Sequence, residues 1–450
     1  MTESKVSRRN YVKYAGAGIV VVAGAAAGAY YMSQPSQPPT ATETQSPTTT
    51  QKEVTLDVAH INYPYFHRAL EIALPRLQEM HPELKISLTE SEQEYSAYRR
   101  YLITRMAAGD APDLMWNDHI WMGEFVDSGF LEPLPDVWAR PEGPVPDLLP
   151  MFKEALTWDN KLYGIWWDTD TRLFVYSKKH IPNPPTNWDE TIELQKTLKA
   201  EGKPPMVFYA AYGWDDTVNS AMYMNIPVDE LQSPGWGFFK VEDGKRIPIF
   251  NGAAGLKAFE YLIKLRDAGA TASYDKPEEI DSAFLNGEYS AEVGGGTWIY
   301  SIAKDSGWAF DRYENEVGYV VQPYPTGGHT ASYGGGFVMT IPTGSKEKDL
   351  AKELLLILLS PEIEAQMGKE YGALFTRKNV LDQLIKDKAV PHADAIAQQL
   401  EYTIPRPLIP EWDRVHRYWI DALQEALLGK KPPQEALDDA AEKVAIVLGG

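Results

Sequence analysis

The sequence contains no cysteine among its 450 residues. Disulfide bonds, cysteine zinc sites, thiol catalysis and a lipid-modified N-terminal cysteine are therefore excluded. Basic residues are also scarce, because 43 Lys and Arg stand against 63 Asp and Glu and give a formal net charge of −20. Nucleic acid and anionic membrane surfaces attract cationic proteins, so we expect neither as a partner. A neutral or cationic ligand fits this composition.

Motifs for metals, nucleotides and serine hydrolysis are missing as well. The eight histidines show no His-Glu-x-x-His or similar spacing, so the sequence predicts no metal site. The glycine runs 294–296 and 334–336 lack the following Lys-Ser/Thr that a nucleotide loop needs. No Gly-x-Ser-x-Gly elbow occurs. We therefore expect no cofactor.

The N-terminus has the three parts of an export signal. Residues 7–13 read Ser-Arg-Arg-Asn-Tyr-Val-Lys, the twin-arginine pattern, and an uncharged run follows over 14–32. That run is just long enough to span a bilayer, so residues 1–32 predict a twin-arginine-type signal or membrane anchor. Residues 33–52 are rich in Ser, Thr and Pro and predict an unfolded linker. We expect an uncleaved anchor that holds the protein at the extracellular face of the cytoplasmic membrane, or secretion if the signal is cleaved.

The remainder of the chain predicts an α/β fold. Apolar residues alternate over 54–58 as in a strand and then follow helical spacing over 66–80. A strand at 86–88, a helix at 95–108 and a strand at 111–116 continue the alternation, which favours parallel pairing. The length exceeds what one core usually organises, so two lobes are expected.

Aromatic residues stand beside carboxylates or glycines at four separate places. The chain has 13 Trp and 25 Tyr, more than a core of this size requires. A sugar ring has an apolar face that stacks on an aromatic ring, and its hydroxyl groups bind carboxylates, amides and backbone groups. The pattern therefore favours a sugar ligand. The four clusters are residues 116–118, 166–170, 214–216 and 296–298.

Asp168 and Asp170 allow a second interpretation. Two residues apart on a strand, they project from one face, and paired carboxylates also serve glycoside hydrolysis. Arg172 would lower a carboxyl pKa and so impair a general acid. We therefore interpret the trio as a hydrogen-bonding array and expect no enzyme.

From about Val54 onward the chain resembles the extracellular solute-binding proteins of ABC importers, in the maltose-binding-protein-like branch (family 1). Each matching stretch is loose by itself, but their order across nearly 400 residues makes the set specific. The stretches are Gly109–Trp116 with Asp127–Leu134, Tyr163–Arg172 with Tyr176–Lys179, Pro185–Glu190, Ala283–Glu288 with Gly296–Trp298, and Tyr333–Phe337 with Ile341–Lys346.

The resemblance implies a two-lobed periplasmic-binding-protein-like fold of type II, whose lobes are joined by crossing hinge strands and close on the ligand. The implied first lobe comprises 53–165 and 297–333, and the second comprises 166–296 and 334–450. By position, the crossings are expected near 165–170, 294–298 and 334–337.

Individual roles follow from the same resemblance. Trp298 matches a stacking tryptophan, Asp168 matches an acidic sugar ligand, and Trp412 lies near a late aromatic contact. The loop with Trp121 matches one that contacts sugar, but Ile120 and Trp121 stand where the maltose type has Asp-Arg, which argues against maltose. The expected ligand-binding residues are Asn117, Asp118, Trp121, Trp167, Asp168, Asp170, Arg172, Trp214, Gly296, Trp298, Gly335 and Trp412.

The function implied is capture of a sugar or oligosaccharide and its delivery to ABC permease subunits by a monomeric receptor. Three alternatives stay open. One is the same fold with a non-sugar solute such as a polyamine or peptide. The others are an exported glycoside hydrolase and a signalling receptor without a permease.

Overall fold

The computed structural model describes residues 51–449, apart from residues 94, 140–142, 146, 149–151, 153–154, 214–215, 229, 232–234 and 275–278. The expected signal or anchor at 1–32 lies outside the described residues, as do residues 33–50 of the expected linker and Trp214. Within the described ranges, no helix is both long and apolar enough to cross a membrane. Lys52, the last residue of the expected linker, already begins the first strand.

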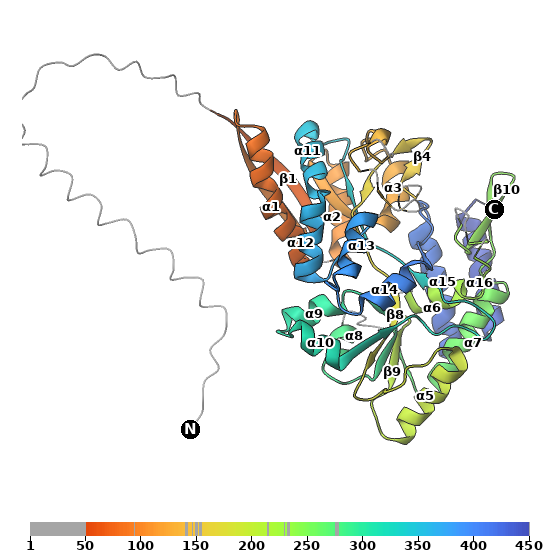
Figure 1. Cartoon of the computed structure of the whole chain (residues 1–450). Helices are drawn as coiled ribbons and strands as arrows, with labels where there is room; N and C mark the ends of the chain where they lie inside the picture. Colours follow the sequence, from red (N-terminus) through yellow and green to blue (C-terminus); the bar gives the residue numbers. More distant parts are fainter. Residues whose placement is uncertain are drawn as a thin grey trace, which may run out of the picture. The chain divides into compact units, whose positions relative to one another are not determined.

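The first five-stranded sheet has the order β2-β1-β3-β16-β6. β1 lies parallel to β2 and β3, as the strand–helix–strand pattern predicts, whereas β16 runs antiparallel to β3 and β6. Helices α1, α11 and α12 pack together, and their buried residues share one core with the strands of this sheet (Figure 1). The strands are β1 (Lys52–Ile61), β2 (Leu84–Gln93), β3 (Leu114–Asp118), β6 (Ile165–Trp166) and β16 (Phe337–Thr340), and the helices are α1 (Pro64–Met80), α11 (Lys348–Leu358) and α12 (Pro361–Tyr371).

The second five-stranded sheet has the order β12-β9-β13-β8-β14. Its central strand β13 is buried along its whole length and pairs parallel with β9 and antiparallel with β8. A separate core on this sheet includes residues from helices α6, α7, α15 and α16. The strands are β8 (Arg172–Ser177), β9 (Met206–Tyr209), β12 (Thr271–Ser273), β13 (Ala291–Gly296) and β14 (Val317–Val320), and the helices are α6 (Asp216–Tyr223), α7 (Ala253–Asp267), α15 (Trp412–Leu427) and α16 (Pro433–Val447).

Four two-stranded pairs and several shorter helices complete the described fold. Two pairs, β7–β17 and β15–β18, flank the connections between the two large sheets. The remaining strands are β4 (Thr157–Trp158), β5 (Lys161–Leu162), β7 (Asp168–Thr169), β10 (Phe239–Glu242), β11 (Lys245–Pro248), β15 (Ser332–Tyr333), β17 (Leu374–Phe375) and β18 (Thr403–Ile404). The remaining helices are α2 (Tyr95–Ala107), η2 (His119–Trp121), α3 (Met122–Asp127), η3 (Asp136–Ala139), α5 (Trp188–Ala200), α8 (Ile280–Leu285), α9 (Ile299–Asp305), α10 (Phe310–Glu316), α13 (Lys378–Lys386) and α14 (Ala393–Leu400).

The chain passes between the sheets at two of the three predicted places. β6 belongs to the first sheet and β8 to the second, so the chain crosses between 166 and 172; β16 returns to the first sheet after 334–336. The prediction of a crossing at 294–298 is wrong, because β13 and β14 both belong to the second sheet. The pairing of β13 with β8 shifts register between Val293 and Gly295, and Gly294 has φ +86°, so these glycines form a β-bulge.

The strand pairing also places parts of two expected residue ranges in the other lobe. Residues 297–333 were assigned to the first lobe, but their strand β14 pairs with β8 in the second sheet. Residues 334–450 were assigned to the second lobe, but β16 is buried between β3 and β6 in the first sheet. Helices α15 and α16 pack on the second core, as that range predicted.

Candidate functional site

Asp168 lies where the chain leaves the first sheet, and it binds groups from two other segments. Its Oδ2 accepts a hydrogen bond from the Tyr65 hydroxyl at 2.6 Å, and its Oδ1 accepts one from the Phe337 backbone N–H at 2.6 Å. Burial raises the pKa of Asp168 to about 7, against the opposing effect of these two hydrogen bonds. The prediction that Arg172 would lower this pKa is wrong for Asp168, because the guanidinium pairs with Asp170 instead.

Arg172 joins the carboxylate of Asp170 to two aromatic rings. Its Nη1 lies 2.5 Å from Asp170 Oδ1, which also accepts the Gly335 backbone N–H at 2.8 Å. The guanidinium lies 4.3 Å from the ring centroid of Trp298 and 4.6 Å from that of Tyr333. The guanidinium therefore occupies aromatic faces on which a flat apolar surface of a ligand could stack.

Gly296 and Gly335 lie where the side chains of Trp298 and Tyr333 approach the backbone closely. A Cβ at Gly296 would lie 2.1 Å from the ring of Trp298, and one at Gly335 would lie 2.6 Å from the Tyr333 hydroxyl. Only glycine allows both rings to lie this close to the backbone.

Asp118 forms a second acidic point at the end of β3. It accepts a hydrogen bond from the Tyr95 hydroxyl at 2.6 Å, lies 2.9 Å from His119 Nδ1 and accepts the backbone N–H of Ile120. Burial acts to raise the pKa of Asp118, but His119 and Arg406 hold it below the ordinary value. This carboxylate therefore stays ionised in a buried place.

Tyr333 connects the Asp118 region to the Arg172 region. The guanidinium of Arg406 lies 4.1 Å from the Tyr333 ring centroid, so the ring is contacted by two arginines. Tyr63 lies edge-on to Phe337 at 5.9 Å and is 41% exposed. Partial burial and the nearby carboxylates of Asp168 and Asp118 raise the pKa of its hydroxyl. Tyr63 therefore offers an accessible aromatic ring beside the acidic groups.

Trp298 is positioned from behind by a pair of buried acids. Its Nε1 donates to Asp281 Oδ2 at 2.8 Å, and the Tyr209 hydroxyl bridges Asp281 and Glu292 at 3.0 and 3.2 Å. Burial raises the pKa of both acids, and for Glu292 the charge of Asp281 adds to the effect. Burial therefore favours the neutral form of Glu292, and the ring of Trp298 is hydrogen-bonded to the buried Asp281.

Several residues predicted from sequence lie in the cores. Trp167 is fully buried and packs on Tyr65 and Phe375, and Trp412 is 2% exposed and stacks on His416 in the second core. Trp121 is 6% exposed and packs with Tyr95 and Phe125.

Asn117 is likewise occupied within the fold. It is fully buried, accepts from Thr340 Oγ1 at 2.6 Å and donates to the backbone oxygen of Asp118. Its amide therefore supports the strand end that carries Asp118. Trp214 is outside the described residues.

The structure thus brings together seven of the predicted residues and adds five that sequence reasoning did not name. The local signals for the added residues were the aromatic density near 63–66, the Tyr-Gly-Gly-Gly-Phe stretch at 333–337 and the Pro-Arg-Pro sequence at 405–407. The predicted members are Asp118, Asp168, Asp170, Arg172, Gly296, Trp298 and Gly335, and the added members are Tyr63, Tyr65, Tyr95, Tyr333 and Arg406.

Comparison with known proteins gives a consistent result. A family model described as bacterial extracellular solute-binding protein matches residues 63–365. A maltotriose-binding protein of Pyrococcus abyssi is 25% identical over 311 residues, which cover 66% of this chain and 62% of that protein. A probable amino-acid ABC transporter periplasmic-binding protein of Sinorhizobium fredii is 26% identical over 298 residues, which cover 64% of each protein. The matched stretch thus spans less than two thirds of either relative.

A solved structure confirms the fold. An ABC transporter solute-binding protein of Thermotoga lettingae, bound with α-D-tagatose, has a TM-score of 0.74 and 22% identity, and the match covers 89% of this chain and all of that one. The two-lobed α/β architecture predicted from sequence is therefore confirmed.

Proposed function

Because this chain belongs to the bacterial extracellular solute-binding protein family, we propose that it is the receptor of an ABC importer that binds a sugar or oligosaccharide between its lobes. In this proposal the receptor delivers the solute to a membrane permease and catalyses no reaction. The ligand contacts are the site residues described above.

The observation that carries the proposal is the meeting of acidic, basic and aromatic groups from both sheets. Asp118 ends β3 of the first sheet, and Arg172 begins β8 of the second. Both are at most 7% exposed, so a solute bound among them would be largely removed from water. An unpaired buried hydroxyl costs about 1–3 kcal/mol, so the fixed carboxylates and guanidinium groups would select the hydroxyl pattern of the ligand.

Sugar is favoured over other solutes by the aromatic rings. Tyr63 offers a flat apolar surface beside carboxylates, which complements the apolar face and the hydroxyl groups of a pyranose. Trp298 is a second aromatic ring of the site, with Arg172 over one of its faces. The maltotriose-binding relative and the tagatose-bound structure support the same class.

A non-sugar solute is the second candidate. The amino-acid transporter relative supports it, and so does the pairing of Arg172 with Asp170, which could be exchanged for the carboxylate and ammonium of a zwitterion. Polyamines would use the acidic groups alone. Competition between these classes is directly measurable.

Glycoside hydrolysis is less well supported by the geometry. The raised pKa of Asp168 is what a general acid needs, but hydrolysis also requires a second carboxylate that acts as base or nucleophile. Asp170 is engaged by Arg172 and by the Gly335 N–H. A release of reducing ends from oligosaccharides by the purified protein would contradict the proposal.

The test is a thermal-shift screen of the full chain against mono- and oligosaccharides, amino acids, peptides and polyamines, followed by calorimetry of the best solute. We expect a sugar to bind and Trp298→Ala to weaken that binding at least tenfold. Trp308→Ala is the matched control, because Trp308 packs against the same core as Trp298 and also stacks under an arginine, Arg312 at 3.6 Å, but Arg312 pairs with Glu316 and with no site carboxylate. Stabilisation by polyamines or amino acids without any response to sugars would overturn the sugar assignment.

A further inference from the structure

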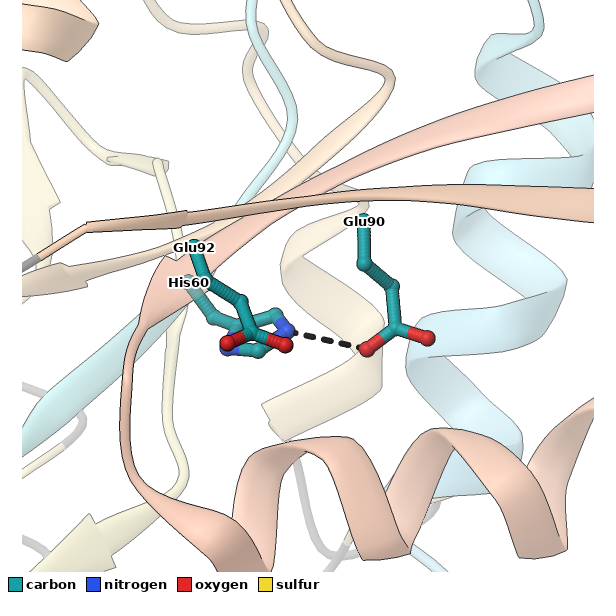
Figure 2. Close-up of side chains that lie close together, drawn as sticks. All are labelled: His60, Glu90 and Glu92. Atoms are coloured by element: carbon teal, nitrogen blue, oxygen red, sulfur yellow. Dashed lines mark hydrogen bonds and ion pairs between the residues drawn. The ribbon is translucent and has the colours of Figure 1, made fainter. Parts of the chain in front are cut away.

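Two neighbouring strands and one helix bring histidines and glutamates together at the edge of the first sheet. In the parallel β1–β2 pair, His60 is the register partner of Glu92 and Val58 that of Glu90. Side chains two residues apart on a strand share a face, so His60, Glu90 and Glu92 project to the same side. Figure 2 shows the three side chains converging, with Glu90 hydrogen-bonded to His60.

The ring of His60 is buried and has a fixed orientation. Its side chain is 1% exposed, and its Nδ1 lies 2.9 Å from the backbone oxygen of Ile61. A carbonyl oxygen only accepts, so Nδ1 carries a proton and Nε2 is the nitrogen that faces the glutamates. A backbone carbonyl on the far nitrogen is the usual support of a metal-binding histidine, because it fixes the tautomer and the ring.

Nε2 of His60 faces a second group that only accepts. It lies 3.1 Å from Glu90 Oε2. An imidazole nitrogen and a carboxylate oxygen are both metal ligands, and at this separation both can bind the same ion. A metal ion bound here would therefore join the buried nitrogen of His60 to the carboxylate of Glu90.

A second histidine reaches the same carboxylate from helix α1. His67 Nδ1 lies 2.8 Å from Glu90 Oε2, and its other nitrogen lies 3.4 Å from Glu71 Oε1. The ligand atoms of His60, Glu90 and Glu92 all lie within 4.8 Å of one another. Ligands of a tetrahedral zinc ion lie roughly 3.4 Å apart, so these three side chains would have to move closer together. His67, which lies outside this group of three but contacts Glu90, would have to move toward them to complete a site of two nitrogens and two oxygens.

We propose that His60, His67, Glu90 and Glu92 form a binding site for one divalent transition-metal ion, with Zn²⁺ as the ion that fits imidazole and carboxylate ligands in a tetrahedral set. The sequence showed no metal motif because the ligands come from three elements that pair only in the folded protein.

The position of the site suggests what a bound ion would do. The six residues between the two histidines carry Tyr63 and Tyr65, and Tyr65 donates to Asp168. An ion held at both ends of this short segment would restrict its motion and hold the tyrosines in place. Metal affinity itself does not depend on the solute, so it can be measured whether or not the proposed function holds.

The test is calorimetric titration of Zn²⁺ into the metal-stripped full chain in detergent. We expect one ion per chain and a dissociation constant at least tenfold weaker in His67→Gln and in Glu90→Gln. His81→Gln is the matched control, because His81 also contacts two glutamates, Glu83 at 3.2 Å and Glu353 at 2.6 Å, but is absent from the proposed site. The control variant should bind Zn²⁺ like the parent.

Circular dichroism checks that each variant is folded. If His67→Gln or Glu90→Gln does not fold, Glu92→Gln takes its place, because Glu92 is exposed. X-ray absorption of the zinc-loaded protein should show two imidazole nitrogens and two carboxylate oxygens. Equal zinc affinity in the parent, His67→Gln and Glu90→Gln proteins would overturn the proposal. So would an equal loss of affinity in His81→Gln.

Discussion

Asp168 is a buried carboxyl group whose proton is held more tightly in the folded protein than in the unfolded chain. Its pKa is raised from 3.8 to about 7, chiefly by burial. The folded state therefore binds more protons than the unfolded state over this range, and the free energy of unfolding should fall as the pH rises from about 4 to about 7. At about 1.4 kcal/mol per pH unit, the effect is at most about 4 kcal/mol.

This dependence is expected to disappear from Asp168→Asn, whose amide carries no titrating proton. Urea unfolding at several pH values would measure it as the difference in the free energy of unfolding between the two proteins. The difference also removes the contribution of other buried acids with a raised pKa, such as Glu292 and Glu364. Asp349→Asn, at a side chain that is 97% exposed, is the control for loss of a carboxylate. A constant difference between parent and Asp168→Asn from pH 4 to 8 would contradict the prediction.

At the same scale, the sequence predicted candidate site residues where they are close together in the chain. Asp168, Asp170 and Arg172 were found because their spacing on a strand is visible locally. Tyr65 and Arg406 were missed because each reaches the site by folding, Tyr65 from 103 residues away. Trp167 and Trp412 fit the sequence pattern of a sugar site as well as Trp298 does, but both are buried in a core. The sequence pattern is the same for a buried and for an accessible tryptophan. Local chemistry was therefore predictable and three-dimensional proximity was not.

Among the elements, the strand that returns from the second sheet to the first depends on Gly336. Its φ is +135°, and a Cβ there would lie 2.1 Å from the backbone oxygen of Asp168 and 2.6 Å from Trp166 Nε1. Gly336→Ala combines backbone strain with a clash against main chain, so we expect a loss of at least about 2 kcal/mol in stability. Thermal and urea unfolding would measure it.

Gly327→Ala separates the two causes. Gly327 also has a positive φ, +80°, but a Cβ there meets nothing within 4 Å. We expect this variant to lose about 1 kcal/mol, the cost of the backbone conformation alone. Equal losses of stability in both variants would show that the close approach of the two crossing segments adds nothing to the cost of Gly336→Ala.

The arrangement of elements was predictable where the signal was periodic and local. Alternation over 54–58 and helical spacing over 66–80 predicted β1 and α1, and the strand–helix–strand order predicted the parallel pairing of β1 with β2. The glycines at 294–296 were taken for an exit from the sheet, but they form a bulge inside β13. Glycine suits both a β-bulge and a strand that leaves its sheet, so the glycine run by itself could not distinguish these two structures.

For the whole molecule, the proposed function together with the burial of the candidate site predicts that solute entry requires the lobes to separate. Asp118, Arg172 and Arg406 are each at most 7% exposed, so a solute cannot reach them from solvent in this arrangement. Solute binding should then shift the population toward the closed arrangement, as in hinge-bending receptors. The backbone N–H groups of Gly335 and Phe337 report on closure, because they donate to Asp170 and Asp168 beside a crossing.

We expect both amides to exchange with deuterium more slowly in the presence of a saturating solute than in its absence. The amide of Val207, paired within the second sheet, should be protected equally in both conditions, because β9 lies inside one lobe. Slow exchange at Gly335 and Phe337 without solute, unchanged on its addition, would mean that the lobes do not open. In that case the buried charges would be structural, and solute binding would have to occur elsewhere on the molecule.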